Sequence, residues 1–207
     1  MIGDTLNKID DLSKCVCHSG GAIGSDSYWE NTTLKYGGKA LSYSYKTDYH
    51  NSVNKVEITD DQYKEGLEKV KSVSKILART FNPKYGSLLS RNWFQVKYSD
   101  VIYAIGEIVL SGDKNKKGYK NKSKLPIVDG GTGYAVMMGI QHGRDVYVFD
   151  QEKDRWYKWS YIVNSFKEIV SDSVFIYTYN FAGIGTRDIK QNGINAISIV
   201  FNNTINK

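Results

Sequence analysis

The stretch HSGGAIGSD, residues 18–26, carries three glycines directly after the short apolar run KCVC, residues 14–17. Each glycine weakens a helix or strand by roughly 0.5–1 kcal/mol relative to alanine, so a cluster indicates a sharp turn or a close approach of the backbone to another group. A strand, a glycine turn and a helix in this order are typical of parallel α/β sheets, in which turns at the carboxyl ends of strands form the ligand crevice. Because free N–H groups at a helix N-terminus bind phosphates, we expect a phosphate-bearing ligand at Gly20 and Gly21.

The composition is that of an ordinary globular protein: of 207 residues, 41% are hydrophobic and 24% are charged. We expect a single α/β domain over residues 1–207, since one domain of this class often reaches such a length. Residues 1–13 are polar and acidic, unlike a secretion signal, and no apolar run approaches the roughly 20 residues of a membrane span. The predicted location is therefore cytoplasmic, with no membrane partner.

Two cysteines, Cys15 and Cys17, precede His18 in a C-x-C-H pattern that invites a metal-binding interpretation. The chain has only two further histidines, His50 and His142, and no second cysteine pair, so a tetrahedral metal site is difficult to complete. On a strand the two cysteines face the same side, and unbound thiols are commonly buried. We therefore expect core thiols, no metal site and no cofactor.

The formal net charge of +6 comes mainly from one segment, residues 113–124, which holds six lysines and one aspartate. A protein that tracks single-stranded DNA needs an extended basic groove with stacking aromatics, so a nucleic-acid partner is disfavoured. The segment is rich in asparagine, glycine and serine, and we expect it to be too polar to pack. Two interpretations stay open: a merely solvated loop, or a lid that attracts an anionic ligand.

Apolar runs and amphipathic stretches alternate along the chain and predict strands followed by helices. The predicted strands cover residues 14–19, 39–45, 101–106, 145–150 and 174–183. The predicted helices cover residues 25–35, 59–79, 90–100, 134–142, part of 156–170 and the residues from 192 onward. Thr59 and Gln62 form a capping box at the start of the helix over 59–79. This order of elements predicts a mostly parallel sheet with helices on both faces.

Three stretches together resemble a known family. RN followed by YSDVIYAIG, then HSGGAIGSDSYWE, and then GGTGYAVMMGIQHGRDVYVFD are similar to the motifs of the DprA/Smf proteins. The wider group is the SLOG superfamily of Rossmann-like domains, which includes the LOG hydrolases and sensors of nucleotide-derived signals in bacterial immunity. The resemblance covers residues 15–35, 90–106 and 129–150, and it implies a Rossmann-like fold that binds a nucleotide-derived ligand.

The stretch FAGIGTRDIKQNG, residues 181–193, resembles the segment that opens a DprA-type domain, yet here it comes last. The resemblance therefore implies a circular permutation, in which the strand near 174–183 lies beside the strand at 14–19. It also implies that residues 107–128 are a basic loop inserted over the crevice. The ligand-binding residues expected from these motifs are Ser19, Gly20, Gly21, Ser25, Asp26, Arg91, Asn92, Gly130, Gly131, Thr132, Gly133, Tyr134, Gly185, Thr186 and Arg187.

The same resemblance bears on catalysis. LOG hydrolases carry the motif PGGxGTxxE, whose glutamate acts on the ribose, and aligning it with the turn at Gly130 puts Met137 at the glutamate. A thioether can neither take a proton nor stabilise an oxocarbenium charge, so no catalytic residue is expected. The resemblance favours non-catalytic binding of a nucleotide-derived small molecule, an ADP-ribose derivative or a cyclic nucleotide, by a phage sponge that sequesters a bacterial immune signal.

Two alternatives stay open. One is a LOG-like N-glycosidic hydrolase of nucleoside phosphates, in which Asp26, Glu107 or Asp129 replaces the missing glutamate. The other is DprA-like binding of single-stranded DNA. Tyr134 and Trp93 are the aromatic residues expected to stack on a base. Because DprA- and LOG-type domains commonly dimerise, the resemblance also implies a homo-oligomer.

Overall fold

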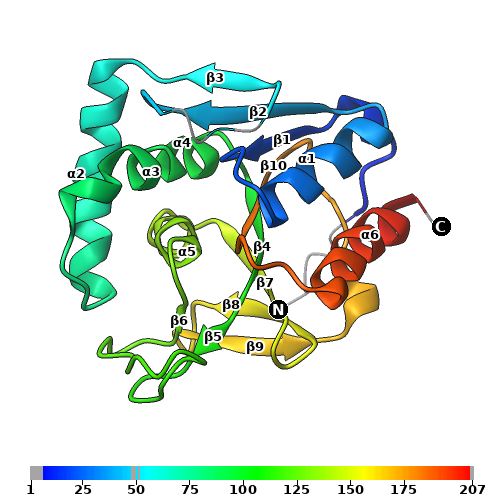
Figure 1. The fold of residues 1–207 in the computed structure, drawn as a ribbon. Coiled ribbons are helices and arrows are strands. Elements are labelled where there is room, and N and C mark those ends of the chain that lie inside the picture. Colours follow the sequence, from blue (N-terminus) through cyan, green and yellow to red (C-terminus); the bar gives the residue numbers. More distant parts are fainter. Residues whose placement is uncertain (1–6, 48–49, 51, 206–207) are drawn as a thin grey trace.

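The fold is built on one large sheet with helices on both faces (Figure 1). The computed structural model describes residues 7–47, 50 and 52–205. Its sheet strands are β1 (Val16–Ser19), β2 (Lys39–Ser44), β3 (Lys55–Glu57), β4 (Val101–Gly106), β7 (Asp145–Asp150), β8 (Arg155–Ser160), β9 (Ser165–Ile169) and β10 (Asn180–Gly185). The α-helices are α1 (Ser25–Lys35), α2 (Asp60–Ile76), α3 (Gly86–Ser90), α4 (Asn92–Lys97), α5 (Thr132–Gln141) and α6 (Gln191–Ile205). A separate two-stranded ribbon pairs β5 (Ile108–Val109) with β6 (Ile127–Val128).

The eight strands of the sheet follow the order β3-β2-β1-β10-β4-β7-β8-β9. Every pair from β3 to β7 is parallel, and only β8 and β9 run antiparallel at one edge. The predicted α/β architecture with a mostly parallel sheet is thus confirmed, and it is Rossmann-like. The last strand, β10, lies between β1 and β4, so the predicted pairing of the strands at the two ends of the chain is also confirmed.

Strand β4 shows how the sequence creates two hydrophobic cores. Ile102 and Ala104 pack under α2, α4 and α5, whereas Val101, Tyr103 and Ile105 pack under α1 and α6. All five side chains are fully buried, as expected for a central parallel strand whose two faces are both covered. Figure 1 shows α2–α5 on one side of the sheet and α1 with α6 on the other.

This distribution of helices creates the ligand crevice expected of the fold. The chain leaves β1 through α1 toward β2, and it leaves β4 through α5 toward β7, on the opposite face and in the opposite direction. In open α/β sheets, such a reversal opens a crevice outside the carboxyl ends of the strands. Here the reversal lies around β10, between β1 and β4.

Local signals were accurate where the helix or strand was long or capped. Helix α1 has the predicted bounds, and α2 begins with the predicted capping box of Thr59 and Gln62. Cys15 and Cys17 are unbridged and fully buried beneath α1, as predicted. Among the described residues, no cluster of three metal-binding side chains is found.

The helix predicted within residues 156–170 is wrong, because the segment forms the hairpin of β8 and β9. Trp156 and Trp159 are three residues apart, a spacing that would put them on one face of a helix. In the sheet they bury on opposite faces, Trp156 under α6 and Trp159 on the α5 side. Asn164, with a φ of 48°, forms the turn between the strands.

The strand predicted over residues 174–183 begins only at Asn180. Val174 and Ile176 are fully buried and alternate as in a strand, but they pack against α6. Instead of pairing with a strand, the backbone N–H of Ile176 donates to the Thr204 hydroxyl, at 2.9 Å. Alternation of apolar residues therefore indicated burial correctly and strand pairing wrongly.

The basic segment, residues 113–124, also differs from the prediction that it is too polar to pack. Asn121 is 4% exposed, and its amide donates to the carbonyl groups of Val109 and Leu125, at 3.0 Å each. The buried Asn115 side chain accepts hydrogen bonds from the N–H groups of Lys117 and Tyr119. Hydrogen bonds from asparagine side chains to the backbone therefore hold this segment together in place of a hydrophobic core. The lysines project outward from the loop that these bonds stabilise.

We predict that Asn121→Ala lowers the free energy of unfolding by about 1–3 kcal/mol, because it leaves buried carbonyl groups without a donor. Urea denaturation measures the loss, and amide hydrogen exchange over residues 109–125 shows whether the segment opens locally. Lys124→Ala, at an exposed position of the same segment, is the control. Equal stability and equal exchange for Asn121→Ala and wild type would show that the amide does not hold the segment.

Candidate functional site

A cavity of about 320 Å³, here called the first cavity, opens at the carboxyl ends of β10 and β4. The loops after the strands, with the first turns of α1 and α5, contribute Ala22, Asp26, Glu107, Asp129, Gly130, Gly131, Thr132, Thr186, Arg187 and Asp188. The α3–α4 region contributes Tyr85, Leu88, Leu89, Arg91, Asn92 and Gln95. The basic segment contributes Lys116 and Lys117. The crevice predicted from the topology is thus present, with charged groups of both signs on its walls.

Asp26, in the first turn of α1, joins two of the glycine loops. Its carboxylate accepts the backbone N–H of Ala22 at 3.3 Å and that of Gly185 at 3.2 Å. Burial raises the pKa of Asp26 to about 6, although Arg91 and the two backbone donors act in the opposite direction. A buried carboxyl group in the wall of a cavity that titrates near neutral pH is a candidate for proton transfer or for ligand-dependent ionisation.

Arg91 presents a buried positive charge to the first cavity. The residue is 3% exposed, and one guanidinium nitrogen, Nη1, donates to the carbonyl of Tyr43 at 3.4 Å. Its Nε is buried and has no acceptor within the described chain. Burial lowers the pKa of Arg91, and the nearby positive charge of Arg187 lowers it further. Because burying an incompletely bonded charge is costly, Arg91 is suited to an anionic ligand.

The glycines of residues 18–26 approach other parts of the protein, which changes the role predicted for them. A Cβ at Gly20 would lie 2.8 Å from Asp26 Oδ2, and one at Gly21 would collide with the His50 ring. Gly24 has a φ of +98°, and its Cβ would lie 2.5 Å from the carbonyl oxygen of Arg187. Gly20 and Gly21 therefore do not line the first cavity. They allow the loop to pack tightly, and this packing places Asp26.

The turn at Gly130 and Gly131 forms the opposite wall. Asn92 Nδ2 donates to the carbonyl of Gly131 at 3.3 Å, and Arg79 donates to the carbonyl of Gly130 at 2.7 Å. With its carbonyl groups held by these side chains, the turn leads directly into the N-terminus of α5, which has no side-chain cap. Uncapped N–H groups at the start of a helix favour an anion.

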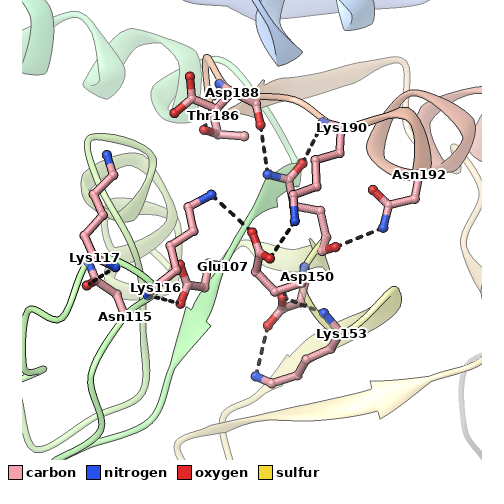
Figure 2. A network of polar contacts seen from close by, with 12 residues as sticks. Glu107, Asn115, Lys116, Lys117, Asp150, Lys153, Thr186, Asp188, Lys190 and Asn192 are labelled. Atoms are coloured by element: carbon pink, nitrogen blue, oxygen red, sulfur yellow. Dashed lines mark hydrogen bonds and ion pairs between the residues drawn. The ribbon is translucent and has the colours of Figure 1, made fainter.

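A network of charged groups attaches the basic segment to the cavity rim (Figure 2). Glu152 pairs with Lys116 at 3.1 Å and with Lys190 at 2.6 Å, and hydrogen bonds from these lysines lower the pKa of its carboxyl group. The backbone N–H of Lys116 donates to Glu107 at 2.9 Å, whereas burial raises the pKa of Glu107. Lys117, the next residue of the segment, also lines the cavity.

The structure brings nine of the fifteen sequence-predicted ligand-binding residues to the first cavity. These are Asp26, Arg91, Asn92, Gly130, Gly131, Thr132, Gly185, Thr186 and Arg187. Ser19, Gly20, Gly21, Ser25 and Gly133 lie outside its lining and serve local packing. Ser25, for example, donates its hydroxyl to the carbonyl of Thr186 at 2.8 Å. Gly133 packs directly against the carbonyl of Val128.

Three side chains predicted at or near the ligand lie elsewhere. Tyr134 is 6% exposed and lines a neighbouring cavity, not the first. Trp93 is buried against α2, where its indole N–H donates to Glu65 at 2.6 Å. Met137, aligned with the glutamate of the LOG motif, is 1% exposed in the core beneath α5. The Met137 side chain therefore does not line the first cavity.

Sequence reasoning missed Gln95, Tyr85 and Gln151. Gln151 directly follows β7, so the rule that selects residues at the carboxyl ends of strands would have found it. It is 4% exposed, and its amide donates to the carbonyl of Asp188 at 3.0 Å and accepts the N–H of Lys190. Gln151 thus holds the loop that carries Arg187. No local sequence signal distinguishes Tyr85 or Gln95.

Comparison with protein-family models, with curated proteins and with solved structures found no match for the chain. The resemblance to the SLOG superfamily and the circular permutation therefore stay predictions. Over residues 7–47, 50 and 52–205, no helix combines the length and the apolar character needed to cross a bilayer.

We predict that the pH dependence of stability reveals the buried carboxyl group of Asp26. Its pKa is about 6 in the folded protein and 3.8 in the unfolded chain, so the folded state holds the proton more tightly. Stability from this group is present below pH 4 and is lost as the pH rises through 6. At about 1.4 kcal/mol per pKa unit, the loss is roughly 3 kcal/mol.

Chemical denaturation of wild type and Asp26→Asn between pH 4 and 7 measures this effect. The free energy of unfolding of wild type, minus that of the variant, should fall as the pH rises. A difference that grows with pH would instead show that the ionised Asp26 is stabilised in the folded protein by Arg91.

Proposed function

We propose that the first cavity binds a phosphate-bearing, nucleotide-derived small molecule, such as an ADP-ribose derivative or a cyclic nucleotide, and releases it unchanged. The observation that carries the proposal is Arg91. Its guanidinium is nearly fully buried, borders the cavity, and keeps an unpaired Nε beside a second arginine, Arg187. Two guanidinium groups and the N-terminus of α5 provide the donors that a phosphate accepts.

The acidic residues of the cavity support a nucleotide over a simple phosphate ion. Asp26, Glu107 and Asp129 line the same cavity as the arginines. Inorganic phosphate would be repelled by these carboxylates, whereas a ribose presents hydroxyl groups that donate to them. The volume of about 320 Å³ is at the lower end of the range of about 300–1,000 Å³ for ligand pockets. A phosphate and a ribose fit this combination of size and charge.

A protein that binds such a signal without turnover lowers its free concentration. This is how the chain would act as the sponge that the family resemblance implies. The predicted nucleotide partner and the sponge role rest on the same step, namely tight binding with no chemical change. One experiment therefore has to show that the ligand binds, and a second has to show that it is released unchanged.

The N-glycosidic hydrolase is a second candidate because of Asp26. Its carboxyl group has a pKa of about 6 and lies in the wall of the cavity, as required of a general acid or base near neutral pH. Two features favour binding. The carboxylate is already bonded to two backbone N–H groups, and Met137, at the motif position of the glutamate, is buried away from the cavity.

We predict that Arg187→Ala weakens the binding of ADP-ribose or 3′,5′-cyclic AMP by about 1.5–3 kcal/mol, the range for a hydrogen bond to a charged group. Because Arg187 is exposed, the melting temperature should change little. Isothermal titration calorimetry measures the affinity. Arg155→Ala is the matched control, since Arg155 is an exposed arginine that pairs with Glu168 on the outer hairpin. Equal affinity for wild type and Arg187→Ala would remove Arg187 from the site.

We predict that wild-type protein returns its ligand chemically unchanged. Purified protein is incubated with ADP-ribose and with nucleoside monophosphates and then heat-denatured, and the released molecules are separated by chromatography. The intact ligand should be recovered at no more than one equivalent per binding site. Free base released over many turnovers would overturn the proposal, and its loss in Asp26→Asn would then identify Asp26 as the acid or base.

A further inference from the structure

A second cavity, of about 650 Å³, adjoins the first at the Gly130–Gly131 turn. Six residues line both cavities: Tyr85, Leu88, Leu89, Asp129, Gly130 and Gly131. The remaining walls come from the loop after α2, from the basic segment, and from Val109, Ile127 and Tyr134. The basic segment thus forms one wall of the second cavity, and its buried asparagines hold that wall in place.

The two cavities differ in the chemistry of their walls. The second has three tyrosines, Tyr85, Tyr119 and Tyr134, together with the cations Arg79, Lys120 and Lys122. Tyr119 is 72% exposed and Tyr85 is 49% exposed, so both present ring surface. The first cavity contains most of the carboxylates and shares only Tyr85 with this group. Exposed aromatic rings beside cations are suited to stacking on a flat, electron-rich ring system.

The Gly130–Gly131 turn allows a ligand to pass from one cavity to the other. Gly130 has a φ of +67°, and a Cβ added there would meet no atom within 4 Å. At Gly131 the nearest atom to such a Cβ is a methyl carbon of Leu89, at 3.8 Å. Both glycines are exposed. The wall between the two cavities therefore carries no side chain at these two positions. It lies beside the uncapped N-terminus of α5, whose free N–H groups would stabilise a bridging phosphate.

We propose that the second cavity holds the nucleobase of the ligand, while the first cavity holds its ribose and phosphate groups. This inference rests on the proposed function and adds the orientation of the ligand to it. The base lies among Tyr85, Tyr119 and Tyr134, and the phosphate crosses the turn toward Arg91 and Arg187. Arg79 holds the turn between the two halves, through its hydrogen bonds to the carbonyl groups of Gly130 and Val128.

Two probes separate the halves of the site. ADP-ribose carries an adenine base, and ribose 5-phosphate carries none. Calorimetry with both probes is carried out on wild type, Tyr119→Ala, Tyr119→Phe and Arg187→Ala. Tyr28→Ala is the control, because Tyr28 is 40% exposed on α1 and lies outside both cavities. The Tyr119 side chain is exposed, and its contact with Asn115 is made by the backbone N–H, so Tyr119→Ala preserves the fold of the segment.

Tyr119→Ala should weaken ADP-ribose binding by roughly 5- to 150-fold, the range for losing one stacked base, and leave ribose 5-phosphate binding unchanged. Tyr119→Phe should bind both probes like wild type, since the ring is kept. Arg187→Ala should weaken both probes. If Tyr119→Ala binds ADP-ribose like wild type while Arg187→Ala does not, the base subsite is overturned and the proposed function stands. If wild type binds neither of these probes nor 3′,5′-cyclic AMP, both are overturned.

Discussion

The carboxylate of Asp26 is the contact on which the architecture of the site depends. It accepts N–H groups from the loop after β1 and from the end of β10, two strands that are far apart in the chain and adjacent in the sheet. Of the acidic groups, the same carboxylate has the largest electrostatic effect on the buried Arg91, and it raises the pKa of that guanidinium. Removing the carboxylate would break two of the hydrogen bonds that order these loops and take away the acidic group with the largest stabilising effect on the Arg91 charge.

Asp26 and Arg91 do not fully compensate each other's buried charge, and the proposed binding of an anion rests on this. Burial pushes the pKa of Asp26 up and that of Arg91 down, so each charge is less stable than it would be in water. A phosphate beside Arg91 would supply the negative charge that the pair lacks. Three further cations, Arg187, Lys116 and Lys117, line the same cavity, and they also favour an anionic ligand.

The basic segment combines a buried hydrogen-bonded interior with a charged outer surface, although its composition alone predicts only a solvated loop. Its asparagines, Asn115 and Asn121, are buried and bond the backbone, so they stabilise the loop in place of apolar side chains. Lys116 and Lys117 line the first cavity, and Tyr119, Lys120 and Lys122 line the second. A loop held in this way positions its charges, whereas a solvated loop would only raise the local concentration of an anion.

The sequence by itself determined the alternation of strands and helices, the mostly parallel sheet, and the glycine turns at the strand ends. Each of these depends on neighbours along the chain: the capping box at Thr59, the apolar run of β4, and the glycines that follow β1. The family resemblance then brought Asp26, Arg91 and Arg187 to one crevice. Asp26 and Arg187 follow the parallel strands β1 and β10, whose carboxyl ends share an edge of the sheet, whereas Arg91 lies between α3 and α4.

Only the tertiary structure decided which groups those glycines approach, and which side chains reach the cavity. Gly21 packs on His50, Met137 and Trp93 are buried in the core, and Tyr134 faces the neighbouring cavity. The hairpin at Trp156 and the buried amide of Asn121 were equally hidden. In each case the outcome depends on a partner distant in sequence, which a pattern of neighbouring residues does not contain.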